Sequence, residues 1–386
     1  MIEVAKIYGW LVDGAPGAPG SPEVLQRVGD DLVAAGVRIA RAAAFIRTLH
    51  PSVMGRRFLW KRGAPVEVRD APHSLLPSTE YVQSPVYVVT STGREFRRRI
   101  DGDEAHEFEI LEQQRQAGMT DYVCLPLPFL SGEVHAITFT TDAPGGFSDE
   151  EIGALRVVTR PLARVAEILA LRRTATALLD AYVGRDAGER ILRGKILRGD
   201  TESIRCVIWF SDLRGFTSMS GSARAGDIIS VLNRVFDCQV PAVEKRGGEV
   251  LKFMGDGMLA IFPVDDAHPA ATVCGDALAA SGAAFAALDA LNAERATAGE
   301  PPLAFGVSLH LGDVAYGNIG GATRLDFTCI GPAVNLASRI EGLTGRLGKR
   351  LLVSDAFARA TTTPLRPVGT FELKGVAGAA TVHEPA

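Results

Sequence analysis

Residues 248–262 read GEVLKFMGDGMLAIF, two apolar runs separated by a Gly-Asp-Gly turn. Each run has the length and the bulky side chains of a β-strand, and a glycine-bracketed turn between two such runs predicts a β-hairpin. A strand near 204–211 and a helix over about 224–245 precede the hairpin. An Ala-rich helix over 268–297 and the strand LAFGVSLHLG (303–312) follow it. This order, β-α-β-β-α-β, predicts a split ferredoxin-like unit of the α+β class.

The strand before this hairpin ends on an acidic residue. In VIWFSDLRGFTSMSG (207–221) the apolar run leads to Asp212, and Gly215 follows in a loop. Because the first strand and the hairpin are neighbours in such a unit, we expect Asp212 to meet Asp256. Two carboxylates with few other acids nearby suit Mg²⁺, and Gly215 lets backbone amides approach phosphate oxygens. A lone aspartate is more often part of turn chemistry, but this pair favours a metal site.

Further polar residues stand out downstream of the hairpin. Asn335 and Arg339 are four residues apart and so share one helix face, where an arginine offers planar donors to a phosphoryl group. The alternative for Arg339 is a solvated salt bridge. Lys252 and Asp326 each stand in an apolar strand, in LKF and LDF. They could read the edge of a base, or they could form a structural ion pair across the sheet.

Three stretches of this sequence resemble, in order and spacing, the signature motifs of class III nucleotidyl cyclases, the adenylate and guanylate cyclase catalytic domain. They are FSDLRGFT (210–217), GGEVLKFMGDGMLAIF (247–262) and RLDFTCIGPAVNLASRIE (324–341). The resemblance covers about residues 203–384. It implies a palm-type catalytic domain over 203–386.

The resemblance also implies roles for individual residues. The implied metal ligands for two Mg²⁺ or Mn²⁺ ions are Asp212, Leu213 and Asp256. The implied adenine-reading pair is Lys252 and Asp326, and the residues that stabilise the transition state are Asn335 and Arg339. The remaining residues implied to bind substrate, at its phosphates, are Gly215, Phe216, Thr217 and Lys374.

The activity that the resemblance implies is that of an adenylate cyclase, a lyase that converts ATP to 3′,5′-cyclic AMP and pyrophosphate. Guanylate-specific members typically carry Glu and Cys where this chain has Lys252 and Asp326. The alternatives are a guanylate cyclase or a catalytically inactive nucleotide-binding signalling module. In cyclases of this kind the metal aspartates and the other site residues come from different chains, so the resemblance implies a homodimer.

The N-terminal half, residues 1–147, mixes helix and strand signals. The stretch over residues 117–152, which includes DYVCLPLPFLSGEVHAITFTT, resembles the last strands and the closing helix of a GAF-type sensor domain. We therefore expect an unidentified small molecule or protein to regulate the catalytic domain through this half.

A helical connector is expected over residues 148–202. Ser148 and Glu151 have the spacing of a capping box, and an apolar seam with steps of three and four follows. The seam packs either on its own domain or on its copy in a dimer, and it consists of Leu155, Val158, Leu162, Val165 and Leu169.

Composition narrows the classes of partner. The formal net charge of −4 gives no overall attraction to nucleic acid or to acidic lipid. The five cysteines form no C-x-x-C pair, which is typical of reduced thiols in a cytoplasmic protein. The start of the chain lacks the pattern of a signal peptide, and the Ala-rich stretch is interrupted by aspartates. We expect a soluble protein that binds neither membrane nor nucleic acid.

Overall fold

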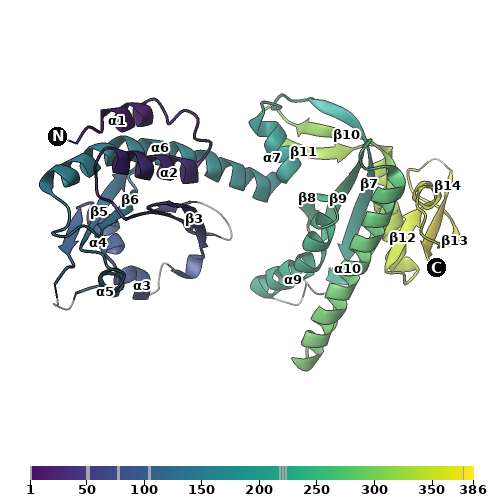
Figure 1. Ribbon diagram of the computed structural model, residues 1–386. Helices are drawn as coiled ribbons and strands as arrows, with labels where there is room; N and C mark the ends of the chain where they lie inside the picture. Colours follow the sequence, from purple (N-terminus) through teal and green to yellow (C-terminus); the bar gives the residue numbers. More distant parts are fainter. Residues whose placement is uncertain are drawn as a thin grey trace. The chain divides into compact units, whose positions relative to one another are not determined.

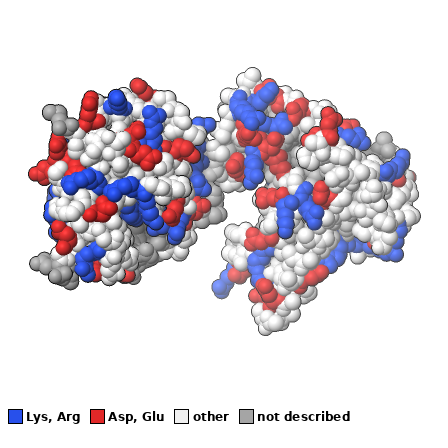
Figure 2. Space-filling model, viewed as in Figure 1, with Lys and Arg blue, Asp and Glu red and all other residues white. Residues whose placement is uncertain are grey.

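The computed structural model describes residues 2–48, 53–75, 79–102, 106–216, 219, 221, 224–376 and 378–386. The chain forms two compact units, Met1–Leu178 and Leu179–Ala386 (Figure 1). The division falls within one long helix, α6 (Asp149–Val183). On the face drawn in Figure 2, positive and negative side chains are interspersed over both units.

The N-terminal unit is built on a six-stranded antiparallel sheet with the order β3-β2-β1-β6-β5-β4. One face packs on α1, α2 and α6, and the other packs on α4 and α5. The strands are β1 (Arg41–Arg47), β2 (Gly55–Lys61), β3 (Ala64–Ala71), β4 (Phe96–Arg99), β5 (Asp121–Pro128) and β6 (Val134–Thr141). The helices besides α6 are α1 (Ala5–Val12), α2 (Ser21–Ala34), the 3₁₀ turn His73–Leu75, α3 (Thr79–Val82), α4 (Pro85–Thr92) and α5 (Glu109–Gln116).

Helix α6 begins with the predicted capping box. The backbone amide of Ser148 donates to Glu151 Oε2 at 2.8 Å, and the amide of Glu151 donates to Ser148 Oγ at 3.2 Å. The apolar seam from Leu155 to Leu169 packs into the core of its own unit, the first of the two arrangements considered above. Pro161 lies inside the helix without ending it.

The C-terminal unit contains an eight-stranded sheet with the order β13-β14-β12-β10-β7-β9-β8, and β11 pairs with β10. The predicted β-α-β-β-α-β order is confirmed by β7 (Thr201–Leu213), α9 (Ala225–Glu244), β8 (Glu249–Met254), β9 (Gly257–Val264), α10 (Ala270–Thr297) and β10 (Phe305–Gly320). The other elements are α7 (Arg185–Leu192), β11 (Leu325–Ile330), α11 (Pro332–Arg346), β12 (Leu351–Ser354), α12 (Asp355–Ala360), β13 (Leu365–Glu372) and β14 (Ala379–Pro385).

Strand β7 lies at the centre of this sheet, between β9 and β10. Its side chains alternate between two cores. Val207 and Trp209 pack with α9 and α10, whereas Cys206 and Ile208 pack with α7 and α11. Because both faces of β7 are buried, its end is a rigid platform for Asp212.

Helix α10 is, within the described ranges, the one helix that is long and apolar enough to cross a membrane by length and composition. Its buried side chains, among them Cys274, Ala277, Ala284 and Leu288, belong to the core of the C-terminal unit. Packing in this core therefore accounts for part of its apolar character. All five cysteines are buried and free.

Candidate active site in the C-terminal unit

Asp212 and Asp256 converge at one end of the central strand. Asp212 is the residue of β7 that pairs with Gly257 of β9, and Asp256 lies in the two-residue turn between β8 and β9. Burial and the nearby charge of Asp256, with which Asp212 also shares a hydrogen bond, raise the pKa of the Asp212 carboxyl to about 6. The tertiary structure thus brings together the two predicted acids.

Two glycines allow close packing around this carboxylate. A Cβ atom at position 257 would lie 3.2 Å from Oδ1 of Asp212. On the other side of β7, Gly306 of β10 pairs with Asp212, and a Cβ atom there would clash with the side chain of Thr344 and lie 3.1 Å from Oε1 of Glu341. Side chains at these positions would crowd the carboxylates that face the end of β7.

Glu341 of α11 is a third acid at this end of the strand, and the sequence reasoning missed it. Burial, followed by the charge of Asp212, raises the pKa of the Glu341 carboxyl to about 7. Thr344 Oγ1 donates a hydrogen bond to Glu341 Oε1 at 3.3 Å. The sequence did contain a signal for it. In SRIEGL (338–343), Glu341 lies next to the apolar residues that form the buried stripe of the predicted helix.

The donor set suits a divalent cation. Carboxylate oxygens are the ligands that Mg²⁺ prefers, and two close carboxylates repel one another unless a cation offsets their charge. No group of three or more His, Cys, Asp or Glu side chains with metal-binding geometry occurs among the described residues. Because Mg²⁺ is six-coordinate, Asp212 and Asp256 would leave coordination positions for other oxygens. Leu213 has a buried apolar side chain, so only its backbone carbonyl could contribute.

The loop after β7 follows directly on this site. Gly215 has a φ of +72°, and Phe216 is half-buried against the core of the unit. Thr217 lies outside the described residues. Arg214 donates to the backbone carbonyls of Thr344, at 3.2 Å, and Lys349, which ties the start of this loop to the end of α11.

Lys252 and Asp326 lie close together within one chain. Lys252 Nζ is 3.6 Å from Asp326 Oδ2, across β8 and β11, and both side chains are partly open to solvent. An exposed pair of this kind contributes little to stability. A donor and an acceptor held side by side at a sheet surface are suited to read a complementary pair of groups on a ligand.

Asn335 and Arg339 lie on an exposed face of α11, away from the acids of their own chain. Neither side chain makes a hydrogen bond or ion pair with any residue that the structure describes. Glu341, which lies near Asp212, is two positions after Arg339. Two positions correspond to a rotation of about 200° around the helix, so Arg339 points away from Asp212. Lys374 is exposed in the turn after β13.

Comparison with known proteins identifies the domain that carries this site. Residues 200–383 match the family model of the adenylate and guanylate cyclase catalytic domain. The C-terminal unit therefore contains a class III cyclase catalytic domain.

Two adenylate cyclases are among the relatives. The protein from Anabaena cylindrica is 38% identical over 170 residues, which cover 43% of this chain and 32% of that protein. Adenylate cyclase 1 of Rhizobium meliloti is 30% identical over 179 residues, which cover 45% of this chain and 26% of that protein. The matched part thus spans a third or less of these relatives. A bacterial light-regulated adenylyl cyclase has a similar fold, with a TM-score of 0.50 and 20% identity over 72% of this chain and 88% of that one.

Proposed function

We propose that this protein is an adenylate cyclase that converts ATP to 3′,5′-cyclic AMP and pyrophosphate. The observation that carries the proposal is the convergence of the Asp212 and Asp256 carboxylates at the end of β7. The family match over residues 200–383 and the adenylate cyclases among the relatives support it.

In this proposal Asp212 and Asp256, with the carbonyl of Leu213, hold two Mg²⁺ or Mn²⁺ ions. Such cations, when bound, lower the pKa of an attacking hydroxyl and neutralise phosphate oxygens. The chain's own contribution is to fix the two carboxylates on a buried strand and a tight hairpin. The amides of the loop from Gly215 through Phe216 and Thr217, and Lys374, would contact the triphosphate.

Adenine selection is assigned to the pair formed by Lys252 and Asp326. Lys252 can donate to a ring nitrogen of adenine, and Asp326 can accept from its amino group. The proximity of the two side chains, 3.6 Å, supports a joint role. Guanine presents a carbonyl oxygen where adenine has an amino group, so the Asp326 carboxylate would be left unpaired or repelled.

We further propose that the active site is shared between two copies of the chain. Asn335 and Arg339 are assigned to stabilisation of the transition state, yet α11 turns Arg339 away from the aspartates of its own chain. A second copy can present Asn335 and Arg339 to those aspartates. The homodimer would then contain two composite sites.

The N-terminal half would act as a GAF-like sensor over residues 1–147, joined by a connector over 148–202 to the catalytic domain over 203–386. An antiparallel sheet covered by helices on both faces supports a sensor of this type. We also place the protein in the cytoplasm, which is in keeping with five free, buried cysteines.

A product assay tests the proposal. The purified chain is incubated with ATP or GTP and Mg²⁺ or Mn²⁺, and the products are separated by liquid chromatography and mass spectrometry. Cyclic AMP is expected from ATP, and Asp212→Asn should reduce its formation on the order of 10²-fold or more while circular dichroism stays unchanged. Asp227→Asn, an exposed acid in the first turn of α9, is the control. A folded Asp212→Asn protein with the parent rate would overturn the assignment.

A further inference from the structure

A surface cavity of the N-terminal unit, wide open to solvent, is lined by arginines. It has a volume of about 780 Å³ and lies where β4 meets the loop that leads into α6. Its lining includes four arginines and one acid, which are Arg38, Arg97, Arg98, Arg99 and Asp149. None of these residues belongs to the cyclase site, which lies in the other unit.

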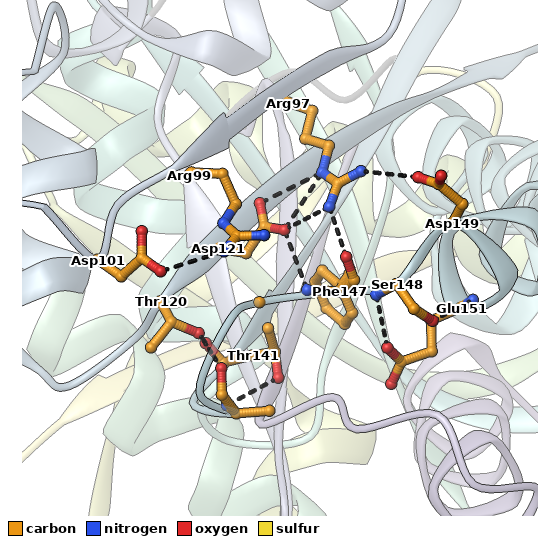
Figure 3. A network of polar contacts seen from close by, with 12 residues as sticks. Arg97, Arg99, Asp101, Thr120, Asp121, Thr141, Phe147, Ser148, Asp149 and Glu151 are labelled. Atoms are coloured by element: carbon orange, nitrogen blue, oxygen red, sulfur yellow. Dashed lines mark hydrogen bonds and ion pairs between the residues drawn. The ribbon is translucent and has the colours of Figure 1, made fainter.

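Two of the arginines are fixed by buried acids. Arg97 donates to Asp121, which is fully buried, at 2.8 Å and to the carbonyl of Phe147 at 2.6 Å. Arg38 binds the buried Glu151 with Nε and Nη2. Figure 3 shows Arg97 between Asp121 and Asp149 beside the start of α6. These contacts orient both guanidinium groups at the edge of the cavity without using Arg38 Nη1.

Arg99 can exchange its present acidic partner for a ligand anion. Its partner within the described ranges is Asp101, at 3.2 Å, and both side chains are exposed. An exposed pair of this kind contributes about 0–1 kcal/mol, so a ligand anion can replace Asp101 at low cost. Asp149 is fully exposed and lies 3.7 Å from Arg97 Nη1, which is longer than a hydrogen bond, so it too can move aside.

The backbone packs closely against Arg99 at Gly146. A Cβ atom at Gly146 would lie 3.1 Å from Arg99 Nε and 2.8 Å from the Asp121 side chain, so only a glycine fits there. Helix α6 begins three residues later, at Asp149, and its dipole favours negative charge nearby. Planar guanidinium groups match the oxygens of a phosphoryl group in pairs, and the volume accommodates a ligand larger than phosphate alone.

We infer that this cavity binds the phosphoryl group of a soluble phosphorylated small molecule, held by Arg99, Arg97 and Arg38. This inference deepens the proposed function, because it gives the chemical class of the regulator of the N-terminal half. Its route to the catalytic unit is α6, which begins beside the cavity and continues without a break to Val183. Binding at the first turn changes the stability of the helix that joins the two units.

The test uses the full chain and inorganic phosphate as the probe. Calorimetric titration at constant ionic strength gives the affinity, and hydrogen exchange locates the site. Phosphate should slow exchange of the amides at residues 145–152. Arg99→Gln should weaken binding at this site about tenfold, as expected for the loss of one charge-assisted contact. The control Arg69→Gln removes an exposed arginine from β3, at the opposite edge of the same sheet, and should change nothing.

A second variant should have the opposite effect on phosphate affinity. Asp101→Asn frees Arg99 from its carboxylate and should tighten phosphate binding. If neither Arg99→Gln nor Asp101→Asn changes the affinity relative to the control, or if exchange at 145–152 does not respond to phosphate, the inference is wrong. The assay measures binding and needs no turnover, so a failure of the proposed cyclase activity would be recognised separately.

Discussion

At the scale of single residues, like charges crowd the end of β7. Asp212, Asp256 and Glu341 come from a strand, a hairpin and a helix. The negative charge of Asp212 contributes to the raised pKa of Glu341. Carboxylates in such proximity repel one another unless a cation is bound. Gly257 and Gly306 allow close packing around this end of the strand. The arrangement is therefore suited to a ligand with positive charge rather than to stability.

The pair Lys252 and Asp326 gives a prediction at this scale. Replacement of both, by Lys252→Glu and Asp326→Cys, should reduce kcat/KM for ATP about 10²-fold or more, because the edge of adenine loses its partners. Steady-state kinetics with ATP and GTP measures the change.

A second cross-strand pair in the same sheet provides the control. Arg205 and Asp313 are register partners on β7 and β10, their charged groups are 3.5 Å apart, and both are exposed. The double change Arg205→Glu and Asp313→Cys should leave ATP kinetics unchanged. If the two double variants behave alike, Lys252 and Asp326 form only a structural pair.

At the scale of elements, the packing of α2 on the sheet predicts the effect of a small substitution. Gly29 faces Trp60 so closely that a Cβ atom would lie 2.7 Å from its Nε1. In Gly29→Ala, better helix propensity should raise the free energy of unfolding by about 1 kcal/mol, and overpacking of the core should lower it by about 1–3 kcal/mol. We therefore expect net destabilisation. The midpoint temperature of thermal unfolding measures this change in stability. Gly153→Ala in α6, where nothing lies within 4 Å, should stabilise instead, and equal effects of the two changes would contradict this account.

The first turn of α6 gives a pH-dependent prediction. Burial alone would raise the pKa of Glu151, but hydrogen bonds from Arg38 and Ser148 outweigh burial and lower it from 4.5 to about 2. A lowered carboxyl pKa stabilises the fold above pH 4.5, and this stabilisation is lost as the pH falls toward 2. Glu151→Gln should therefore reduce the free energy of unfolding at pH 7 by on the order of 2–3 kcal/mol.

Urea unfolding at pH 7, 5 and 3 measures this difference, which should shrink at pH 3. The exposed Glu23 in the first turn of α2 provides the control, Glu23→Gln, with a small effect at every pH. A constant difference between Glu151→Gln and the parent from pH 7 to pH 3 would show that the carboxylate charge is not what stabilises this turn.

At the scale of the whole molecule, the composite site predicts complementation. Asp212→Ala and Arg339→Ala chains should each be inactive, whereas a mixture should regain up to about a quarter of the parent activity if chains exchange at random. Half of the dimers are then mixed, and one of their two sites carries neither change. Differential tags and cyclic AMP assays measure dimer formation and activity together.

The matched control mixes Asp212→Ala with Asp256→Ala. Both changes affect the half of the site that comes from the same chain, so every site keeps a lesion and no activity should return. Mixed dimers of Asp212→Ala and Arg339→Ala that form but stay inactive would exclude a shared site.

Much of the catalytic half could be predicted from the sequence because its signals are local. A glycine-bracketed turn between apolar runs specifies a hairpin. In the N-terminal unit, Ser148 with Glu151 likewise specifies a helix start. The convergence of Asp212 with Asp256 could also be predicted from the sequence, since the order of elements makes β7 and the hairpin neighbours. Glu341 was missed because its approach to Asp212 depends on how α11 packs on β7 and β10, which no local pattern encodes.

The sequence by itself determined the α+β class, the order of elements in the catalytic unit and the stretches that carry chemistry, because periodicity and turn residues act over short distances. Only the tertiary structure decided what long-range packing controls. It placed the Leu155–Leu169 seam in the core of its own unit, turned Arg339 away from Asp212, and gathered Arg38, Arg97 and Arg99 around one cavity. An apolar stripe or a charged side chain fits several partners equally well, and only the folded chain selects among them.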